Sequence, residues 1–249
     1  MNHDAVSPTR RAINLTAEAC YREEGAGIGA GGEALRVLEQ RTTFKLLRGM
    51  RVAEVGCASL QLAHVVLPLG VDYRGVDIHL EDSDLRQVET LRTGLGEACG
   101  TFEVDEGDVS HYQVPIFHND DQYDAVFCTE TIEHLSNPYF MCAQVKRALK
   151  PGGVFVLAFP RPEDNLGYGG GKHAHVYPGF LLRDSFELFM QQLFFKQVHR
   201  HENGSSAWYV FANYKGYGIV DVFSMTTGNY DDATLFEHLD AYQPPISGR

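Results

Sequence analysis

Five short strand-like segments alternate with segments of helical spacing between residues 51 and 160, and this order restricts the folds available to the chain. The strand-like segments occupy 51–56, 71–78, 101–109, 123–130 and 152–160, and the helical segments occupy 59–70, 83–95 and 137–150. A repeated strand–helix order is typical of a parallel sheet with helices on both faces. We therefore predict an α/β fold with a Rossmann-like, doubly wound and mostly parallel sheet.

The pattern changes after residue 160. A glycine-rich loop leads to a helical segment over 179–193, and strand-like runs follow over 194–202 and 207–215. The dipeptide Asn203-Gly204 separates these two runs, and Asn-Gly between strands is a strong hairpin signal. We expect the sheet to end in an antiparallel hairpin.

The chain before residue 51 predicts one helix and a flexible segment. Residues 33–47 have helical spacing, and Gly49 stops it. The glycine-rich run over 25–32 precedes every predicted strand, so it predicts a hinge or lid and not a dinucleotide fingerprint. We divide the chain into an N-terminal cap or lid segment (1–32), a main domain (33–213) and a C-terminal extension packed on that domain (214–249).

Composition bears on partners and compartment. The chain has 33 acidic and 21 basic residues and a formal net charge of −12, which repels phosphate backbones and anionic lipids. Its five cysteines show no Cys-x-x-Cys spacing, and no apolar run reaches the roughly 18 residues of a membrane span. We expect a cytoplasmic protein that acts on a small-molecule substrate, with no nucleic-acid or membrane partner; a homo-oligomer is left open.

Polar residues follow each predicted strand, at the sheet edge where open α/β folds bind ligands. The small residues 56–59 after the first strand let the backbone approach a ligand, although an ordinary turn has the same composition. Asp77 after the second strand suits the two hydroxyls of a ribose, although a solvent-exposed aspartate is the alternative. We expect four carboxylates to converge at this edge: Glu54, Asp77, Asp108 and Glu130.

Two motifs make the chain resemble a known family. The segment YDAVFCTETIEHL (123–135), followed by a helix and then LKPGG (149–153), is similar to the class I S-adenosylmethionine-dependent methyltransferases. The likeness is greatest to their small-molecule branch, which includes the ubiquinone-pathway O-methyltransferase type, and it extends over residues 33–213. It implies that 33–213 is a methyltransferase domain involved in small-molecule metabolism, with S-adenosyl-L-methionine as cofactor.

The resemblance assigns residues to the cofactor by position. The family begins its site with an acidic residue and a Gly-x-Gly-x-Gly run. Glu54 and Gly56 match that run, whereas Ala58 and Leu60 replace its later glycines. The remaining matches are Asp77 at the ribose, Ile78 beside the adenine, Asp108 and Val109 at the adenine edge, and Glu130 near the methionine end. The cofactor-binding residues implied are therefore Glu54, Gly56, Cys57, Ala58, Asp77, Ile78, Asp108, Val109 and Glu130.

The reaction itself needs a base if the acceptor is a hydroxyl. The cofactor carries an activated methyl group, so the protein mainly positions the reactants, but an oxygen acceptor must also lose a proton. His134 is the first candidate base, and His173 and His175 in the loop after the fifth strand are the second. A loop histidine is also a common surface or packing residue.

Two other functions compete with methylation of a small-molecule hydroxyl. Glu130, Glu133, His134 and a loop histidine are similar to the metal ligands of small-RNA 2′-O-methyltransferases, but the net charge opposes RNA, and we assign no metal. The substituted glycines also permit a catalytically impaired S-adenosylmethionine-binding or regulatory subunit. A dehydrogenase is disfavoured because only Gly56 remains of its Gly-x-Gly-x-x-Gly motif.

Overall fold

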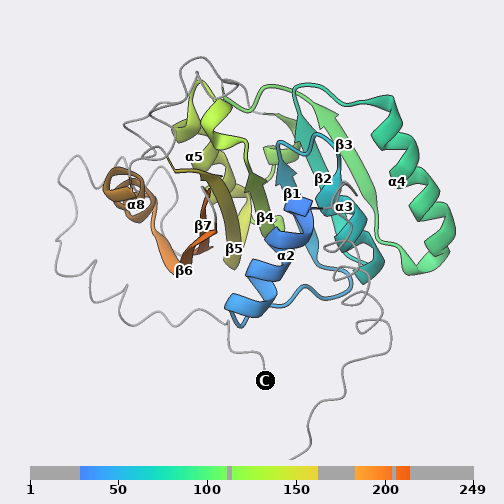
Figure 1. Cartoon of the computed structure of the whole chain (residues 1–249), viewed down its shortest axis with the longest axis horizontal. Helices are drawn as coiled ribbons and strands as arrows, with labels where there is room; N and C mark the ends of the chain where they lie inside the picture. Colours follow the sequence, from blue (N-terminus) through green and yellow to red (C-terminus); the bar gives the residue numbers. More distant parts are fainter. Residues whose placement is uncertain (1–28, 111–113, 162–182, 204–205, 214–249) are drawn as a thin grey trace, which may run out of the picture.

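The computed structural model describes residues 29–110, 114–161, 183–203 and 206–213 (Figure 1). These residues form a seven-stranded sheet of order β3-β2-β1-β4-β5-β7-β6. Strands β1 to β5 pair in parallel, and β7 lies antiparallel to both β5 and β6. The bounds are β1 Arg51–Val55, β2 Asp72–Asp77, β3 Phe102–Glu106, β4 Tyr123–Thr129, β5 Leu149–Pro160, β6 Phe195–Asn203 and β7 Ser206–Asn213. The prediction of a mostly parallel sheet ending in an antiparallel hairpin is confirmed.

Helices cover both faces of this sheet (Figure 1). Buried residues of α2, α3 and α4 pack on one face, and those of α5 and α8 pack on the other. The bounds are α2 Gly29–Arg41, α3 Gln61–Val66, α4 Asp82–Leu95, α5 Pro138–Ala148 and α8 Arg183–Gln192, with short 3₁₀ helices η1 Leu67–Leu69, η2 Gly96–Ala98, η3 Pro115–Phe117 and η4 Ile132–His134. Among the helices described here, none is both long and apolar enough to cross a bilayer.

The central strands are apolar on both sides because each face is covered. In β4, Ala125 and Phe127 join the core under α2 and α3, whereas Val126 and Cys128 join the core under α5 and α8. Successive side chains of a strand point to opposite faces, so a strand buried on both faces has a continuous apolar sequence. This burial explains why a run of apolar residues predicts a central strand such as β4.

The predicted first helix differs from α2 at both ends. Helix α2 ends at Arg41 instead of residue 47, because the Thr42 hydroxyl donates to Leu38 O (2.5 Å) and accepts the Phe44 N–H (3.1 Å). It begins at Gly29, so residues 29–32, which we expected in a hinge or lid, form its first turn. Gly31 is buried there, and a Cβ on it would lie 2.4 Å from Leu62 N, so α2 and α3 pack closely.

The hairpin is joined to the parallel part of the sheet by two buried polar side chains. Asn213 at the end of β7 donates from Nδ2 to Leu149 O (2.7 Å). The Lys146 Nζ on α5 donates to Phe194 O (3.2 Å) and to the Asn213 amide oxygen. Burial lowers the pKa of Lys146 to about 7, and Asp121 opposes this shift. The contacts fix both ends of the hairpin against α5 and β5.

Part of the predicted chain division lies outside the described residues. The parts outside include residues 1–28, residues 162–182 and the whole C-terminal extension over 214–249. The boundaries at 32 and 213 therefore stay predictions, as does the packing of the extension on the domain.

Candidate active site

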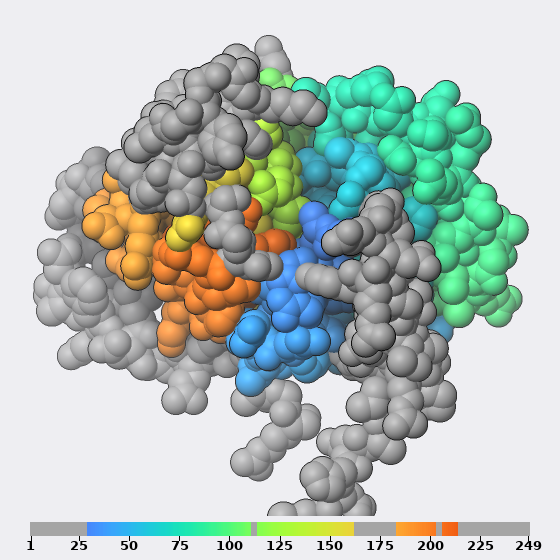
Figure 2. Space-filling view, in the orientation of Figure 1, coloured from blue at the N-terminus to red at the C-terminus, as the bar shows by residue number. Residues whose placement is uncertain are grey.

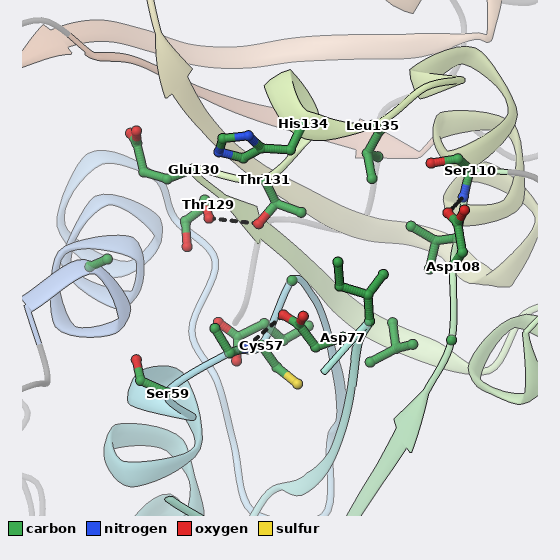
Figure 3. Close-up of a pocket in the computed structure, with 18 of the residues that line it drawn as sticks. Cys57, Ser59, Asp77, Asp108, Ser110, Thr129, Glu130, Thr131, His134 and Leu135 are labelled. Atoms are coloured by element: carbon green, nitrogen blue, oxygen red, sulfur yellow. Dashed lines mark hydrogen bonds between the residues drawn. The ribbon is translucent and has the colours of Figure 1, made fainter. Parts of the chain in front are cut away.

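A cavity of about 640 Å³ lies at the carboxyl ends of the parallel strands (Figure 3). Residues that follow β1, β2, β3 and β4 line it, together with Ala30 and Gly31 at the start of α2. All four predicted carboxylates line this cavity: Glu54, Asp77, Asp108 and Glu130. The other cofactor-site residues expected from the sequence line it as well, namely Gly56, Cys57, Ala58, Ile78 and Val109.

The turn after β1 lines the cavity. The N–H groups of Gly56 and Cys57 donate to Val76 O (2.9 and 3.2 Å), which joins the turn to β2. Gly56 has a φ of 74°, and a Cβ on it would lie 1.9 Å from the Thr131 Oγ1. Only glycine fits this position without a displacement of Thr131 or of the turn.

The two residues that replace later glycines of the motif still adopt a positive φ. Ala58 has a φ of 21° and Leu60 a φ of 55°. The Leu60 side chain is fully buried in the core under α2 and α3, and this burial offsets the cost of its backbone conformation. The turn thus keeps left-handed backbone at both substituted positions.

We predict that glycine at these two positions has unequal effects on stability. Ala58→Gly relieves strain without losing a buried side chain, so its free energy of unfolding stays within about 1 kcal/mol of the parent. Leu60→Gly removes a buried leucine and lowers that free energy by about 2–4 kcal/mol. Urea unfolding of the two variants measures both quantities. Equal losses of unfolding free energy in the two variants would contradict the conclusion that burial of Leu60 offsets the cost of its backbone conformation.

Asp77 connects the second strand to this turn. Its Oδ2 accepts the Ala58 N–H (2.8 Å), and its Oδ1 accepts the His79 N–H (3.3 Å). Ile78 beside it is 75% exposed at the cavity, an unusual position for a large apolar side chain. The pair offers a carboxylate and an apolar surface to the same ligand.

The turn after β3 is fixed in a similar way. The Gly107 N–H donates to Asp77 O (2.8 Å), and the Asp108 Oδ1 accepts the Ser110 N–H (2.7 Å). Val109 is 5% exposed, and its carbonyl accepts from the Gln144 Nε2 of α5 (3.2 Å). Asp108 and Val109 therefore lie on a turn that is held from β2 and from α5.

Glu130 lies on the opposite side of the cavity from Asp108 (Figure 3). Its φ is 51°, and its N–H donates to Ala158 O of β5 (2.9 Å). Its carboxylate accepts from the Ser206 Oγ of β7 (2.9 Å). The hairpin thus supplies a contact to the cavity, which sequence reasoning missed because it depends on strand order.

Glu54 is the most deeply buried of the four carboxylates, at 4% exposed. The Tyr73 hydroxyl donates to its Oε2 over 2.5 Å. Burial raises the pKa of Glu54 to about 8; the Tyr73 hydrogen bond lowers this pKa and the nearby Asp77 raises it. Tyr73 was missed from the sequence, where it is one aromatic residue in an apolar strand.

His134 lines the cavity from η4, with its side chain 39% exposed. Its Nε2 lies 3.7 Å from the Oε1 of Glu133, a side chain that is 1% exposed. Burial raises the pKa of Glu133 to about 8, with a further contribution from Glu130. Neither carboxylate oxygen accepts a hydrogen bond from another residue that the structure describes.

Glu133 and His134 could also be expected from the sequence to cap the helix that follows them, but the structure shows that they do not. The cap of α5 is Asn137, whose side chain accepts the Phe140 N–H (3.1 Å). His134 is instead placed by η4, where its N–H donates to Thr131 O (2.9 Å). Neither side chain is therefore used to cap α5, and His134 lines the cavity.

The second pair of candidate bases, His173 and His175, lies outside the described residues. Over the described ranges, no group of three or more His, Cys, Asp or Glu side chains is arranged to hold a metal ion.

The cavity also has lining residues that sequence reasoning did not name, which include Ser110, Thr129, Thr131 and Leu135. Thr129 and Thr131 follow the fourth strand, so the strand-end rule that found Glu130 applies to them too.

Comparisons with known proteins identify a methyltransferase domain in this chain. A family model described as a methyltransferase domain matches residues 53–157. The ubiquinone biosynthesis O-methyltransferase of Dechloromonas aromatica is 30% identical over 112 residues, which are 45% of this chain and 45% of that protein. That of Klebsiella pneumoniae subsp. pneumoniae is 30% identical over 107 residues, which are 43% of this chain and 41% of that protein. The match spans less than half the length of each relative.

Solved structures show the same fold at low sequence identity. A SAM-dependent methyltransferase from Aquifex aeolicus superposes with a TM-score of 0.53 and 18% identity, over 84% of this chain and 98% of that one. The [4+2]-cyclase SpnF superposes with a TM-score of 0.56 and 14% identity, over 74% of this chain and 81% of that one.

The sheet order and the cavity at its strand ends match the fold of solved S-adenosylmethionine-dependent methyltransferases. S-adenosylmethionine is the cofactor of this class. More particularly, residues 53–157 form the methyltransferase domain that the family model describes.

Proposed function

We propose that this cavity binds S-adenosylmethionine and that the protein transfers its methyl group to a hydroxyl of a small molecule. The observation that carries the proposal is the convergence of four carboxylates, from the ends of four strands, on one cavity. The names of the relatives, which are ubiquinone biosynthesis O-methyltransferases, support an oxygen acceptor.

The lining residues fit the parts of that cofactor. Asp77 and Ile78 offer hydrogen-bond acceptors and an apolar surface for the ribose and adenine, and Asp108 and Val109 offer the same pair at the next strand end. Gly56, Cys57 and Ala58 allow close approach of the backbone, and we assign Glu54 and Glu130 to the methionine side, where a positive charge on the ligand favours their ionised forms. An anionic lining favours a ligand that carries a sulfonium and an ammonium group.

The chain's own contribution to the chemistry is to orient the acceptor and take its proton. S-adenosylmethionine, when bound, supplies a methyl group that is already activated. His134 at the cavity receives the proton of the acceptor hydroxyl, and the acidic Glu133 beside it stabilises the imidazolium when ionised. Close placement of the two reactants supplies much of the remaining rate enhancement.

One observation favours a second candidate, a subunit that binds the cofactor without methylating an acceptor. Ala58 and Leu60 occupy positions where the resembled motif has glycine. SpnF, which has the same fold, is a [4+2]-cyclase, so this fold is also found with other reactions. A turnover assay with S-adenosylmethionine and a panel of hydroxylated acceptors separates the two candidates, because a subunit without activity binds the cofactor and forms no methylated product.

We expect Asp77→Ala to weaken S-adenosylmethionine binding by about 1.5–3 kcal/mol, the usual worth of a charge-assisted hydrogen bond. Isothermal titration measures this as a 10- to 150-fold rise in the dissociation constant. Asp72→Ala is the matched control, since the Asp72 Oδ1 also accepts a backbone N–H, that of Thr101 (2.9 Å), but at the other end of β2. An unchanged dissociation constant for Asp77→Ala removes Asp77 from the site.

A further inference from the structure

Three polar side chains meet beneath the turn after β1, where the sheet is otherwise apolar. Glu54, Cys57 and Tyr73 are 4%, 2% and 1% exposed, respectively. The Tyr73 hydroxyl donates to the Glu54 Oε2 over 2.5 Å, and Glu54 also lines the cavity. A buried tyrosine therefore contacts a carboxylate that faces the ligand site.

Gly75 provides the space for this cluster. It pairs with Glu54 across the two strands, and a Cβ on it would lie 2.8 Å from the Cys57 Sγ and 2.9 Å from the Tyr73 hydroxyl. The Tyr73 ring is held in turn by Phe102 of β3, which stacks on it at 5.7 Å with an interplanar angle of 10°. The hydroxyl is thus fixed in position, with little freedom to turn away from Glu54.

The charge on Glu54 has no cationic partner in this cluster. Among the residues that the structure describes, the titratable groups that face it are Tyr73 and Asp77 of β2, Cys57 of the turn and Cys128 of β4, and none of these four carries a positive charge. Burial therefore favours the protonated carboxyl, with a pKa of about 8, while the donated hydroxyl favours the ionised one. A positive charge in the cavity adds to the effect of the hydroxyl.

We propose that Tyr73 is a positioning residue that holds the Glu54 carboxylate toward the cavity, so that the site selects a ligand with a positively charged part. The proposal rests on the proposed function, because S-adenosylmethionine carries such charges on its sulfonium and amino groups. Binding near neutral pH then converts the Glu54 carboxyl to a carboxylate and releases its proton to solvent. The affinity for S-adenosylmethionine rises with pH until Glu54 is already ionised in the free protein.

The test compares Tyr73→Phe with a matched control, Tyr123→Phe. Tyr123 is also 1% exposed, and it is the first residue of β4, at the strand end away from the cavity. Its hydroxyl donates to Ile116 O (2.8 Å). Isothermal titration uses two ligands, S-adenosylmethionine and 5′-methylthioadenosine, which keeps the nucleoside but lacks both positive charges. Measurements run from pH 6.5 to 8.5, in buffers of different ionisation enthalpy, which report the protons released on binding.

We expect Tyr73→Phe to weaken S-adenosylmethionine binding about tenfold at pH 7 and to move the pH at which affinity levels off upward. Binding of 5′-methylthioadenosine stays unchanged, and Tyr123→Phe leaves both ligands unchanged. The parent protein releases close to one proton on binding S-adenosylmethionine at pH 7, and Glu54→Gln releases none. A loss of packing alone would affect both ligands and would leave proton release intact.

The outcomes separate this inference from the function on which it rests. If the parent protein binds no S-adenosylmethionine at any of these pH values, the proposed function and the inference both fail. If it binds, but Tyr73→Phe behaves like Tyr123→Phe or weakens both ligands equally, only the role of Tyr73 is overturned. Should Tyr73→Phe not fold, the proton count of the parent against Glu54→Gln decides, and equal counts overturn the proposal.

Discussion

Replacement of His134 with alanine lowers the turnover number by a factor of 10² to 10⁴, the usual contribution of a general base. The dissociation constant for S-adenosylmethionine changes little, because His134 is assigned to the acceptor and not to the cofactor. Steady-state kinetics with a hydroxylated acceptor and isothermal titration with S-adenosylmethionine measure the two effects separately. This pattern is expected because His134 lines the cavity beside the buried Glu133.

Two further variants sharpen the result. Glu133→Gln keeps the shape of the side chain but cannot ionise to stabilise the His134 imidazolium, so it lowers turnover without a comparable change in cofactor affinity. His118→Ala is the control, because His118 follows η3, is exposed and does not line the cavity. Full activity of His134→Ala would move the role to His173 or His175, or show that the reaction needs no base.

Gly56→Ala has the largest expected effect on the fold of the site. Its Cβ would lie 1.9 Å from the Thr131 Oγ1, so the turn or Thr131 must move. The backbone cost of a positive φ and the overpacking together lower the free energy of unfolding by about 2–5 kcal/mol. The displaced turn also weakens S-adenosylmethionine binding. Urea unfolding and isothermal titration measure these losses.

Gly49→Ala is the matched control for this substitution. Gly49 has a φ of 79°, close to the 74° of Gly56, but a Cβ on it meets nothing within 4 Å. It therefore shows the backbone cost alone, about 1–2 kcal/mol, with cofactor binding unchanged. If the two variants lose the same stability and bind the cofactor equally, the contact between Gly56 and Thr131 does not shape the site.

Most of the fold was predictable because the sheet is covered on both faces. The burial of β1, β4 and β5 makes their sequences largely apolar, and the alternation of strands and helices along the chain then predicts the architecture. The end of α2 was not predictable from periodicity, because Leu46 remains buried beyond Arg41 and continues the apolar pattern. The hydrogen bonds of the Thr42 hydroxyl end the helix, although the helical spacing of apolar residues continues beyond it.

The candidate site was predictable where it follows a positional rule. Glu54, Asp77, Asp108 and Glu130 were found because each lies at or just beyond the end of a strand, and the structure brings them to one cavity. Tyr73, Gly75 and Gly31 were missed because their importance comes from what approaches them in three dimensions. For the two glycines, nothing nearby in the sequence shows whether a glycine allows another part of the chain to pack closely or forms a turn.

The start of α2 at the cavity gives the protein a natural place for an optical reporter. Ala30 and Gly31 line the cavity, and Figure 2 shows α2, in blue, on the visible surface beside the hairpin strands in orange. A side chain added at Gly29 or Gly32 meets nothing within 4 Å, so a cysteine at either position accepts a dye without a clash. With Cys20 and the half-buried Cys99 changed to serine, the three buried thiols, Cys57, Cys128 and Cys142, react slowly. Fluorescence from such a label would follow filling of the pocket in real time, for any acceptor, without the need to know the product.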